Sequence, residues 1–372
     1  MAGGIHILPF FIPHLGCPHK CIFCNQHSVT GRAAYPKEEE IVHSINNWEG
    51  DSLPEIAFYG GSFTGLPFQW QKYFLNPAFH ALKAKKIIGI RVSTRPDYIN
   101  EEVLDFLSSF GVNTVELGVQ SLDEEVLSRS CRGHTVDDVI RAVALLKKRD
   151  FRVGVQLMPG LPGDNRRKSI RGAFKIAGME PNMARIYPTL VIKDTLLHKF
   201  FLEGNYKPLS LDEAVDLSKD ILAIFLFHKI QVIRIGLHPT KDITQEVAAG
   251  PFHPAFGELV ESDLIKEQII MAIKAYGKNK KFSQLTLFVN YRDYSMAAGH
   301  KKKNIDFLKH NFQVKQVKIL GRDYFPRGTV GISGINGNHP ELLVLQREFL
   351  HYYVTRRLME NLDNKGGREW KF

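Results

Sequence analysis

Three cysteines stand close together near the start of the chain, at a spacing that could hold a metal cluster. They are Cys17, Cys21 and Cys24, in the run Cys-Pro-His-Lys-Cys-Ile-Phe-Cys. A cubane [4Fe–4S] cluster commonly takes four cysteine thiolates, one for each iron. Three thiolates on one short loop would therefore leave the fourth iron open to bind another molecule. An open position distinguishes a catalytic metal site from a closed structural one, a rule stated for zinc that we extend to iron.

A structural zinc site is the main alternative for these cysteines. Such a site needs four ligands, normally in two separated pairs of cysteine or histidine. One histidine among His14, His19 and His27 could be the fourth ligand, but no second pair at zinc-finger spacing follows. The fourth cysteine, Cys131, is distant, and we expect it to be a small buried apolar residue. We therefore favour an iron–sulfur cluster over zinc, and over a disulfide.

The cysteine spacing, with the aromatic Phe23 just before the last cysteine, resembles the cluster motif of the radical S-adenosylmethionine (radical SAM) enzymes. This resemblance implies that the open iron binds the amino and carboxylate groups of S-adenosylmethionine (SAM). It also implies that one electron from the cluster cleaves SAM to methionine and a 5′-deoxyadenosyl radical. The protein then binds, orients and shields these cofactors. The implied cofactors are a [4Fe–4S] cluster and SAM, and the implied partner is an electron donor such as flavodoxin or ferredoxin.

Further residues at the ends of predicted strands match the SAM-binding positions of related enzymes. Glycines there could simply permit a turn with positive φ, and polar residues could be ordinary turn or cap residues. Glutamine can donate and accept, as ribose hydroxyls require, and arginine can make a forked contact to a carboxylate. The resemblance implies that the glycines contact the SAM amino group, the serine and glutamines the ribose, and the arginine the carboxylate. This set is Gly60, Gly61, Ser93, Gln120, Arg132 and Gln156.

Several longer segments resemble the radical SAM region of the Elongator catalytic subunit. They are residues 58–64, 93–97, 116–122, 157–164, 185–192 and 251–262, within a similarity that spans roughly residues 5–270. The Gly-Leu-Pro-Gly run at 160–163 also resembles oxygen-independent coproporphyrinogen III oxidase. The acetyltransferase domain of the Elongator protein is not expected here, so neither acetyl transfer nor uridine carboxymethylation is predicted.

The charge of the chain favours an acidic partner. There are 49 lysines and arginines against 39 aspartates and glutamates, a formal net charge of +10. Basic residues gather at 278–281, at 300–303 and after residue 355. This asymmetry, with the Elongator-like core, favours tRNA or another RNA as substrate, although a solvated basic surface is the simpler reading. A small, porphyrin-like molecule is an alternative substrate. A third possibility is a non-catalytic RNA-binding protein whose cluster senses redox state.

The elements that must position these residues alternate between strands and helices. We expect strands at 5–12, 56–59, 88–93, 114–119, 153–157, 184–187 and 232–235, and helices at 37–48, 68–85, 101–110, 136–149, 166–177 and 211–228. Repeated strand–helix units predict a parallel sheet, here a partial (β/α)6 TIM-like barrel of the radical SAM type. In such barrels the chemistry lies at the carboxyl ends of the strands, where the motifs above fall.

The pattern changes near residue 276. We predict a radical SAM core barrel over 1–275 and a smaller, basic α+β domain over 276–372. The second domain should contain strands at 282–289 and 314–320 and a helical end at 340–362. No apolar run approaches the roughly 20 residues of a membrane helix, and four cysteines without a paired framework favour a reducing, cytoplasmic setting.

Overall fold

The computed structural model describes residues 5–12, 15–17, 21–25, 34–237, 241–277, 283–334 and 338–363. Contacts divide the chain into two compact units. Unit 1 comprises Met1–Ser210 and Ile230–Phe252, and unit 2 comprises Leu211–Lys229 and His253–Phe372. The sequence-based domain boundary at residue 275 stays a prediction.

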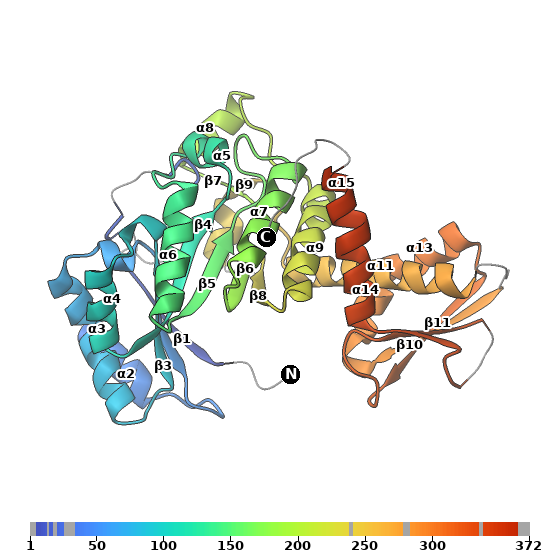
Figure 1. Cartoon of the computed structure of the whole chain (residues 1–372), viewed down its shortest axis with the longest axis horizontal. Helices are drawn as coiled ribbons and strands as arrows, with labels where there is room; N and C mark the ends of the chain where they lie inside the picture. The colour runs from blue at the N-terminus through green and yellow to red at the C-terminus, as the bar shows by residue number, and fades with distance from the viewer. Residues whose placement is uncertain are drawn as a thin grey trace. The chain divides into compact units, whose positions relative to one another are not determined.

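Unit 1 is built on a seven-stranded sheet in which every neighbouring pair is parallel, in the order β1-β2-β3-β4-β5-β6-β8. The strands are β1 (Ile7–Phe11), β2 (Glu55–Tyr59), β3 (Gly89–Thr94), β4 (Val112–Gln120), β5 (Arg152–Leu157), β6 (Met183–Ile186) and β8 (Gln231–Ile235). Figure 1 shows the sheet curling, with helices along its outer face. This is the partial (β/α) barrel that the sequence predicts, and all seven strands fall where expected.

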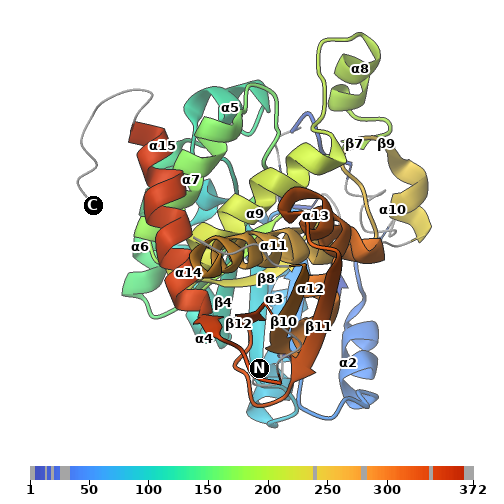
Figure 2. The same ribbon diagram turned by 90° about the vertical axis from the view of Figure 1, so that its right-hand side faces the viewer.

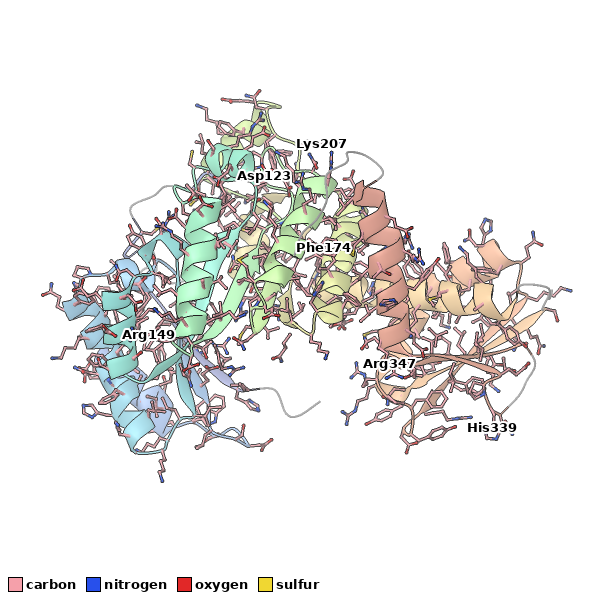
Figure 3. All side chains as sticks on the ribbon, viewed as in Figure 1. Asp123, Arg149, Phe174, Lys207, His339 and Arg347 are labelled. Carbon is pink, nitrogen blue, oxygen red and sulfur yellow. The ribbon has the colours of Figure 1, made fainter. Side chains whose placement is uncertain are left out.

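Helices cover the outer face of the sheet, and the last four of them along the chain begin with side-chain caps. The covering helices are α2 (Glu38–Asn46), α3 (Phe68–Lys83), α4 (Glu101–Ser109), α5 (Glu124–Arg129), α6 (Val136–Lys148) and α7 (Arg166–Gly178). Asp123, labelled in Figure 3, accepts from the Val126 amide at 3.2 Å and so satisfies one of the free N–H groups at the start of α5. Thr135 and Asp138 form a capping box at the start of α6. On α7, the buried Phe174 lies on the face turned to the core.

Unit 2 contains a four-stranded mixed sheet in the order β11-β10-β12-β13. The strands are β10 (Gln284–Asn290), β11 (Gln316–Arg322), β12 (Val330–Ser333) and β13 (Leu342–Val344). Its helices are α9 (Leu211–Phe227), α11 (Phe256–Tyr276), α12 (Tyr294–Ala298), α13 (Lys303–Phe312), α14 (Gln346–Tyr352) and α15 (Glu360–Asp363), with a π-helical stretch, η5, at Tyr353–Met359. The long helix α11 packs on β12, β13 and α9 (Figure 2).

The helical prediction for 340–362 is wrong at its start. Residues Leu342–Val344 pair antiparallel with β12, and the helix begins only at Gln346. The apolar run at 342–345 suits a buried strand as well as a helix, because short apolar runs lack a distinguishing period. Among the described residues, no helix is long and apolar enough to cross a membrane.

Candidate functional site

The cysteine loop follows β1 and lies against the glycine-containing loop that follows β2. The Ser62 amide donates to the Leu15 carbonyl at 3.0 Å. A Cβ atom on Gly61 would lie 2.1 Å from the Leu15 oxygen, and one on Gly16 would lie 2.2 Å from the Ser62 oxygen. Gly60 and Gly61 also have positive φ, at 85° and 36°. Glycine is needed here because the two backbones approach so closely. A contact of Gly60 and Gly61 with SAM stays a prediction.

The two residues between Cys21 and Cys24 anchor the loop in unit 1. Ile22 is buried with Val191, Leu197 and Tyr206, and Phe23 packs on the same cluster. The Ile22 amide donates to the Ser130 carbonyl at 3.2 Å, and its carbonyl accepts from the Leu197 amide at 2.8 Å. Leu197 belongs to α8 (Leu196–Leu202), and Val191 to a two-stranded sheet of β7 (Val191–Ile192) and β9 (Val247–Ala249). The loop is therefore held at its centre.

The three loop cysteines differ in exposure. Cys21 is buried, Cys17 is half-buried and Cys24 is exposed. None of the four cysteines, all of which the structure describes, forms a disulfide. Cys131 is exposed, so the prediction that it is a buried apolar residue is wrong. Cys131 has φ of 50° in the turn after α5, and this turn directs it to the surface.

Arg132 lies directly beside the cysteine loop. Its Nη1 donates to the Cys21 Sγ at 3.3 Å and its Nη2 donates to the Gly118 carbonyl at 2.6 Å. The Nε of Arg132 is buried and has no hydrogen-bond partner among the described residues. The guanidinium therefore already holds the Cys21 sulfur, while its Nε–H remains without a partner among the described residues. Its predicted contact with the SAM carboxylate stays a prediction.

A second arginine near the cysteines has no role assigned by the sequence analysis. Arg95, 2% exposed, donates to both carboxylate oxygens of Asp97 at 3.0 and 2.9 Å. Its Nη1 is buried without a partner among the described residues. Burial lowers the pKa of Arg95, but Asp97 and then the thiolates of Cys17 and Cys21 raise it further, so the net shift is upward. The sequence signal that could have identified Arg95 is its position just after the predicted strand at 88–93.

The polar residues predicted at the ends of β4 and β5 come together. Gln156 Nε2 donates to Gln120 Oε1 at 3.3 Å. A Cβ on Gly118 would lie 2.7 Å from Arg132 Nη2 and 3.1 Å from Gln120 Nε2, so Gln120 and Arg132 lie next to this glycine. Gln120 has φ of 67° next to an irregularity in the β4–β5 pairing, which redirects the end of the strand. Ser93 is half-buried on β3, in register with Glu116 of β4.

A network of charged side chains fills the inside of the curled sheet. Glu55 accepts from Arg91 at 2.5 Å, and Arg91 also donates to Glu116 at 2.5 Å. Arg185 donates to both oxygens of Glu116, at 2.6 and 3.0 Å, and reaches the hydroxyls of Tyr59 at 2.9 Å and Tyr187 at 3.1 Å. We call Glu55, Tyr59, Arg91, Glu116, Arg185 and Tyr187 the interior network.

Neighbouring charges decide the protonation states in the interior network. Burial acts to raise the pKa of Glu116, but the hydrogen bonds and charges of Arg185 and Arg91 outweigh it and lower the pKa. Burial and the charge of Glu116 raise the pKa of the Tyr59 hydroxyl. The carboxylate therefore stays ionised and the tyrosine stays neutral. Two carboxylates balance two guanidinium groups, so the network is neutral overall.

His134 is a buried histidine that the sequence analysis did not single out. It is 3% exposed, and its Nε2 lies 3.2 Å from the Val119 carbonyl. Nδ1 has no partner among the described residues. Burial, followed by the charges of Arg132 and Arg95, lowers the pKa of His134 to about 3. This imidazole is therefore neutral at pH 7, and Nε2 carries the proton.

The donors around the loop fit an iron–sulfur cluster. Three thiols stand on one loop, and the guanidinium groups of Arg95 and Arg132 lie next to them. The free donors on Arg95 and Arg132 could serve cluster sulfur or a carboxylate. Within the described part of the chain, no group of three or more His, Cys, Asp or Glu side chains could hold a single metal ion. His14, His19 and His27, the histidines of the zinc alternative, lie outside the described residues.

Comparisons with known proteins agree with this geometry. Residues 11–170 match the family model of the Radical SAM superfamily, and residues 181–266 match the Radical SAM C-terminal domain. The chain is 31% identical over 264 residues to a tRNA uridine(34) acetyltransferase of Methanocaldococcus jannaschii, covering 58% of this chain and 48% of that protein. It is 30% identical over 376 residues to Elongator complex protein 3 of Homo sapiens, covering 88% of this chain and 64% of that protein.

A third relative and a solved structure extend these matches. An uncharacterized protein of M. jannaschii is 31% identical over 223 residues, covering 56% of this chain and 68% of that protein. The structure of archaeal Elp3 from Methanocaldococcus infernus superposes with a TM-score of 0.58 at 24% identity, covering 72% of this chain and 64% of that one, and supports the fold. The chain spans about half the length of the first curated relatives it matches.

Proposed function

Because this chain belongs to the radical SAM superfamily, whose enzymes use a [4Fe–4S] cluster and SAM, we propose that Cys17, Cys21 and Cys24 hold the cluster and that the chain cleaves SAM reductively to modify tRNA. The observation that carries the proposal is the anchored three-cysteine loop at the carboxyl ends of the strands, with Arg95 and Arg132 next to its sulfurs. When bound, these cofactors supply a 5′-deoxyadenosyl radical, which removes a hydrogen atom from the substrate.

The residues of the chain bind and orient the cofactors in this account. Ile22 fixes the loop between Cys21 and Cys24. Arg132 holds the sulfur of Cys21, and hydrogen bonds to cluster sulfurs adjust the reduction potential. The interior network fills the centre of the curled sheet with matched charges, which keeps the strand ends in a fixed arrangement.

The proposed SAM contacts are those that the sequence predicts. The free Nε of Arg132 supports a role in binding the SAM carboxylate, because a buried donor without a partner is unfavourable. The pairing of Gln156 with Gln120 supports a shared hydrogen-bonding surface for ribose hydroxyls. In this proposal the backbone of Gly60 and Gly61 contacts the SAM amino group, and Ser93, on β3, contacts the ribose.

The proposed substrate is tRNA. Its support is the similarity to relatives whose names specify tRNA uridine(34), together with the net charge of +10. A flavodoxin or ferredoxin in the cytoplasm would supply the electron in this proposal.

The SAM-cleaving part of the proposal is tested by reconstituting the chain anaerobically with iron and sulfide, then adding SAM and dithionite. We expect 5′-deoxyadenosine and methionine in the product mixture. Alanine at Cys17, Cys21 or Cys24 should abolish the product, whereas alanine at the exposed Cys131 should leave it unchanged. A cluster-loaded parent protein that forms no 5′-deoxyadenosine contradicts the proposal.

The tRNA part is tested by a binding titration across a salt series. Phosphate contacts make the logarithm of the affinity fall linearly with the logarithm of salt concentration. We expect such a slope with bulk tRNA. If the chain does not bind tRNA at low salt while it still cleaves SAM, the substrate is instead a small molecule.

A further inference from the structure

Three exposed tyrosines stand where the parallel strands β10 and β11 of unit 2 end. Asn290, the last residue of β10, is in register with Arg322, the last of β11. Tyr291 and Tyr294 follow the first strand and are 52% and 48% exposed, while Tyr324 follows the second and is 62% exposed. Within residues 283–334 these are the exposed large apolar side chains. The ends of two neighbouring strands therefore present aromatic rings without exposed aliphatic neighbours.

The two loops that carry the tyrosines are tied to each other. Asn290 Nδ2 donates to the Phe325 carbonyl at 2.5 Å. Asp293 accepts from the Gly328 amide at 2.8 Å and pairs with Arg327. Gly321 allows close approach, because a Cβ there would lie 3.0 Å from the Tyr291 Cα. The rings are thus mounted on a fixed base, which reduces the entropy lost when a ligand stacks on them.

Positive charge lies next to these rings and on the segment that follows α12. Arg292 lies with its guanidinium 5.4 Å from the Tyr291 ring centroid, and its Nε donates to the Tyr291 hydroxyl at 2.7 Å. Arg322 lies on the same strand end, and the exposed Lys301, Lys302 and Lys303 follow α12, which contacts β11.

Few opposite charges offset this group. Within residues 283–334, no ion pair neutralises Arg292, Arg322 or the three lysines. The exposed carboxylates near these residues are Asp323 and Asp306, since Asp293 is buried and paired with Arg327. The surface therefore keeps a net positive charge. We call Tyr291, Arg292, Tyr294, Lys301, Lys302, Lys303, Arg322 and Tyr324 the strand-end surface.

We propose that the strand-end surface binds an unpaired stretch of RNA, with bases stacked on the tyrosines and phosphates held by Arg292, Arg322 and the lysines. Stacking on aromatic side chains next to basic residues is how proteins bind single strands with little sequence preference. Exposed tyrosine and arginine also occur at protein interfaces, but the excess of basic over acidic side chains on this surface matches a phosphate backbone. The inference rests on the proposed function and deepens it, because it names the unpaired part of the RNA substrate as the part that unit 2 holds.

The experiment measures fluorescence anisotropy of a labelled single-stranded RNA of about 12 nucleotides, a length within the range that single-strand sites cover, with the full chain. The test variant replaces Tyr291, Tyr294 and Tyr324 together by alanine. The control is Tyr352→Ala, which removes a tyrosine of unit 2 that is 51% exposed on α14. We expect the triple variant to bind at least about 30-fold more weakly, since each stacked base contributes a roughly 5- to 150-fold factor. The control should stay within twofold.

A second variant separates stacking from misfolding. Phenylalanine at the three positions keeps the rings and should keep the affinity within about threefold, because stacking needs the π-face and not the hydroxyl. A double-stranded RNA of the same sequence should bind more weakly than the single strand. Equal binding of the triple alanine variant and the parent would overturn the proposal, as would tighter binding of the duplex.

A second measurement, of 5′-deoxyadenosine formed without RNA in the same protein preparations, distinguishes failure of this inference from failure of the proposed function. The triple alanine variant should form as much as the parent. If SAM is cleaved and RNA affinity is unaffected by the tyrosines, this inference fails and the proposed chemistry stands. If the parent neither cleaves SAM nor binds tRNA, the proposed function itself fails.

Discussion

The same pair of side chains occurs in two very different settings in this molecule. In unit 1, Arg185 lies 5.4 Å from the ring of Tyr59, and in unit 2, Arg292 lies 5.4 Å from the ring of Tyr291. Arg185 also has a bidentate contact with the buried Glu116 and is itself half-buried. Arg292 and Tyr291 are exposed, and no carboxylate among residues 283–334 pairs with Arg292.

The difference lies in what surrounds each pair. A buried guanidinium must be matched by a carboxylate, because an unpaired charge in the interior is strongly unfavourable. The interior network meets this requirement fully, so its charges serve the fold. The strand-end surface leaves its charges and rings to solvent, where they contribute little to stability and are available to a ligand. The paired charges of the interior network therefore stabilise the fold, and the unpaired charges of the strand-end surface serve the proposed RNA binding.

Removing one carboxylate should have the largest effect on stability. Glu116→Gln keeps the shape of the side chain but leaves Arg91 and Arg185 without their shared anion. We expect the free energy of unfolding to fall by about 3–5 kcal/mol, the range for breaking a buried ion pair. Urea denaturation measures the change. The control, Glu360→Gln, removes an exposed partner of Arg356 and should lose less than about 1 kcal/mol. Equal losses at both sites would refute the comparison.

The buried histidine should make unit 1 sensitive to mild acid. The folded state holds the pKa of His134 at about 3, below the ordinary value of 6.5. Stability is therefore complete above pH 6.5 and is lost as the pH falls towards 3, since only the unfolded state takes up the proton there. Between pH 7 and pH 5 this loss amounts to about 2 kcal/mol. In His134→Gln the acid-dependent loss should be smaller by this amount.

The control for this pH dependence is Asn311→Gln, an exposed change on α13 that removes no titratable group. Its unfolding free energy should depend on pH as that of the parent does. A parent protein whose stability is flat between pH 7 and pH 5 would show that His134 is not held neutral.

Arg132 should influence the electron affinity of the reconstituted cluster. Arg132→Gln removes a positive hydrogen-bond donor from the Cys21 sulfur. The reduction potential should fall by about 60 mV, which is a tenfold change in a one-electron equilibrium. Potentiometric titration followed by electron paramagnetic resonance measures it. Arg129→Gln, which removes an exposed arginine paired with Glu125 on α5, is the control and should leave the potential unchanged.

The smallest effect on stability is expected on the strand-end surface. Arg292→Gln should change the unfolding free energy by less than about 0.5 kcal/mol. The same change should reduce the salt slope of RNA binding by about 1, which corresponds to one lost phosphate contact. A large loss of stability with an unchanged salt slope would assign Arg292 to the fold and not to recognition.

Much of unit 1 could be predicted from the sequence because its signals are local. Each strand is short and rich in β-branched or aromatic residues, each capped helix begins with a recognisable residue such as Thr135, and Gly60 and Gly61 mark a close backbone approach. The placement of Gln120 next to Gln156 follows from parallel strands ending at one edge.

Other features depend on contacts between distant segments and were missed. The interior network joins Glu55, Arg91, Glu116 and Arg185 across four strands. Their shared signal was a charged residue at an inward position of an otherwise apolar strand. Helix α11 was also missed. Its apolar residues occur around most of its circumference, so no amphipathic stripe distinguishes it.

The most direct test of the central claim is the electron paramagnetic resonance spectrum of the anaerobically reconstituted, dithionite-reduced protein, recorded with and without SAM. The account predicts a signal of a reduced [4Fe–4S] cluster whose g-values change when SAM is added, because SAM binds the iron that Cys17, Cys21 and Cys24 leave open. A cluster signal that SAM does not alter, or stoichiometric zinc at this loop in protein isolated without oxygen, would contradict it.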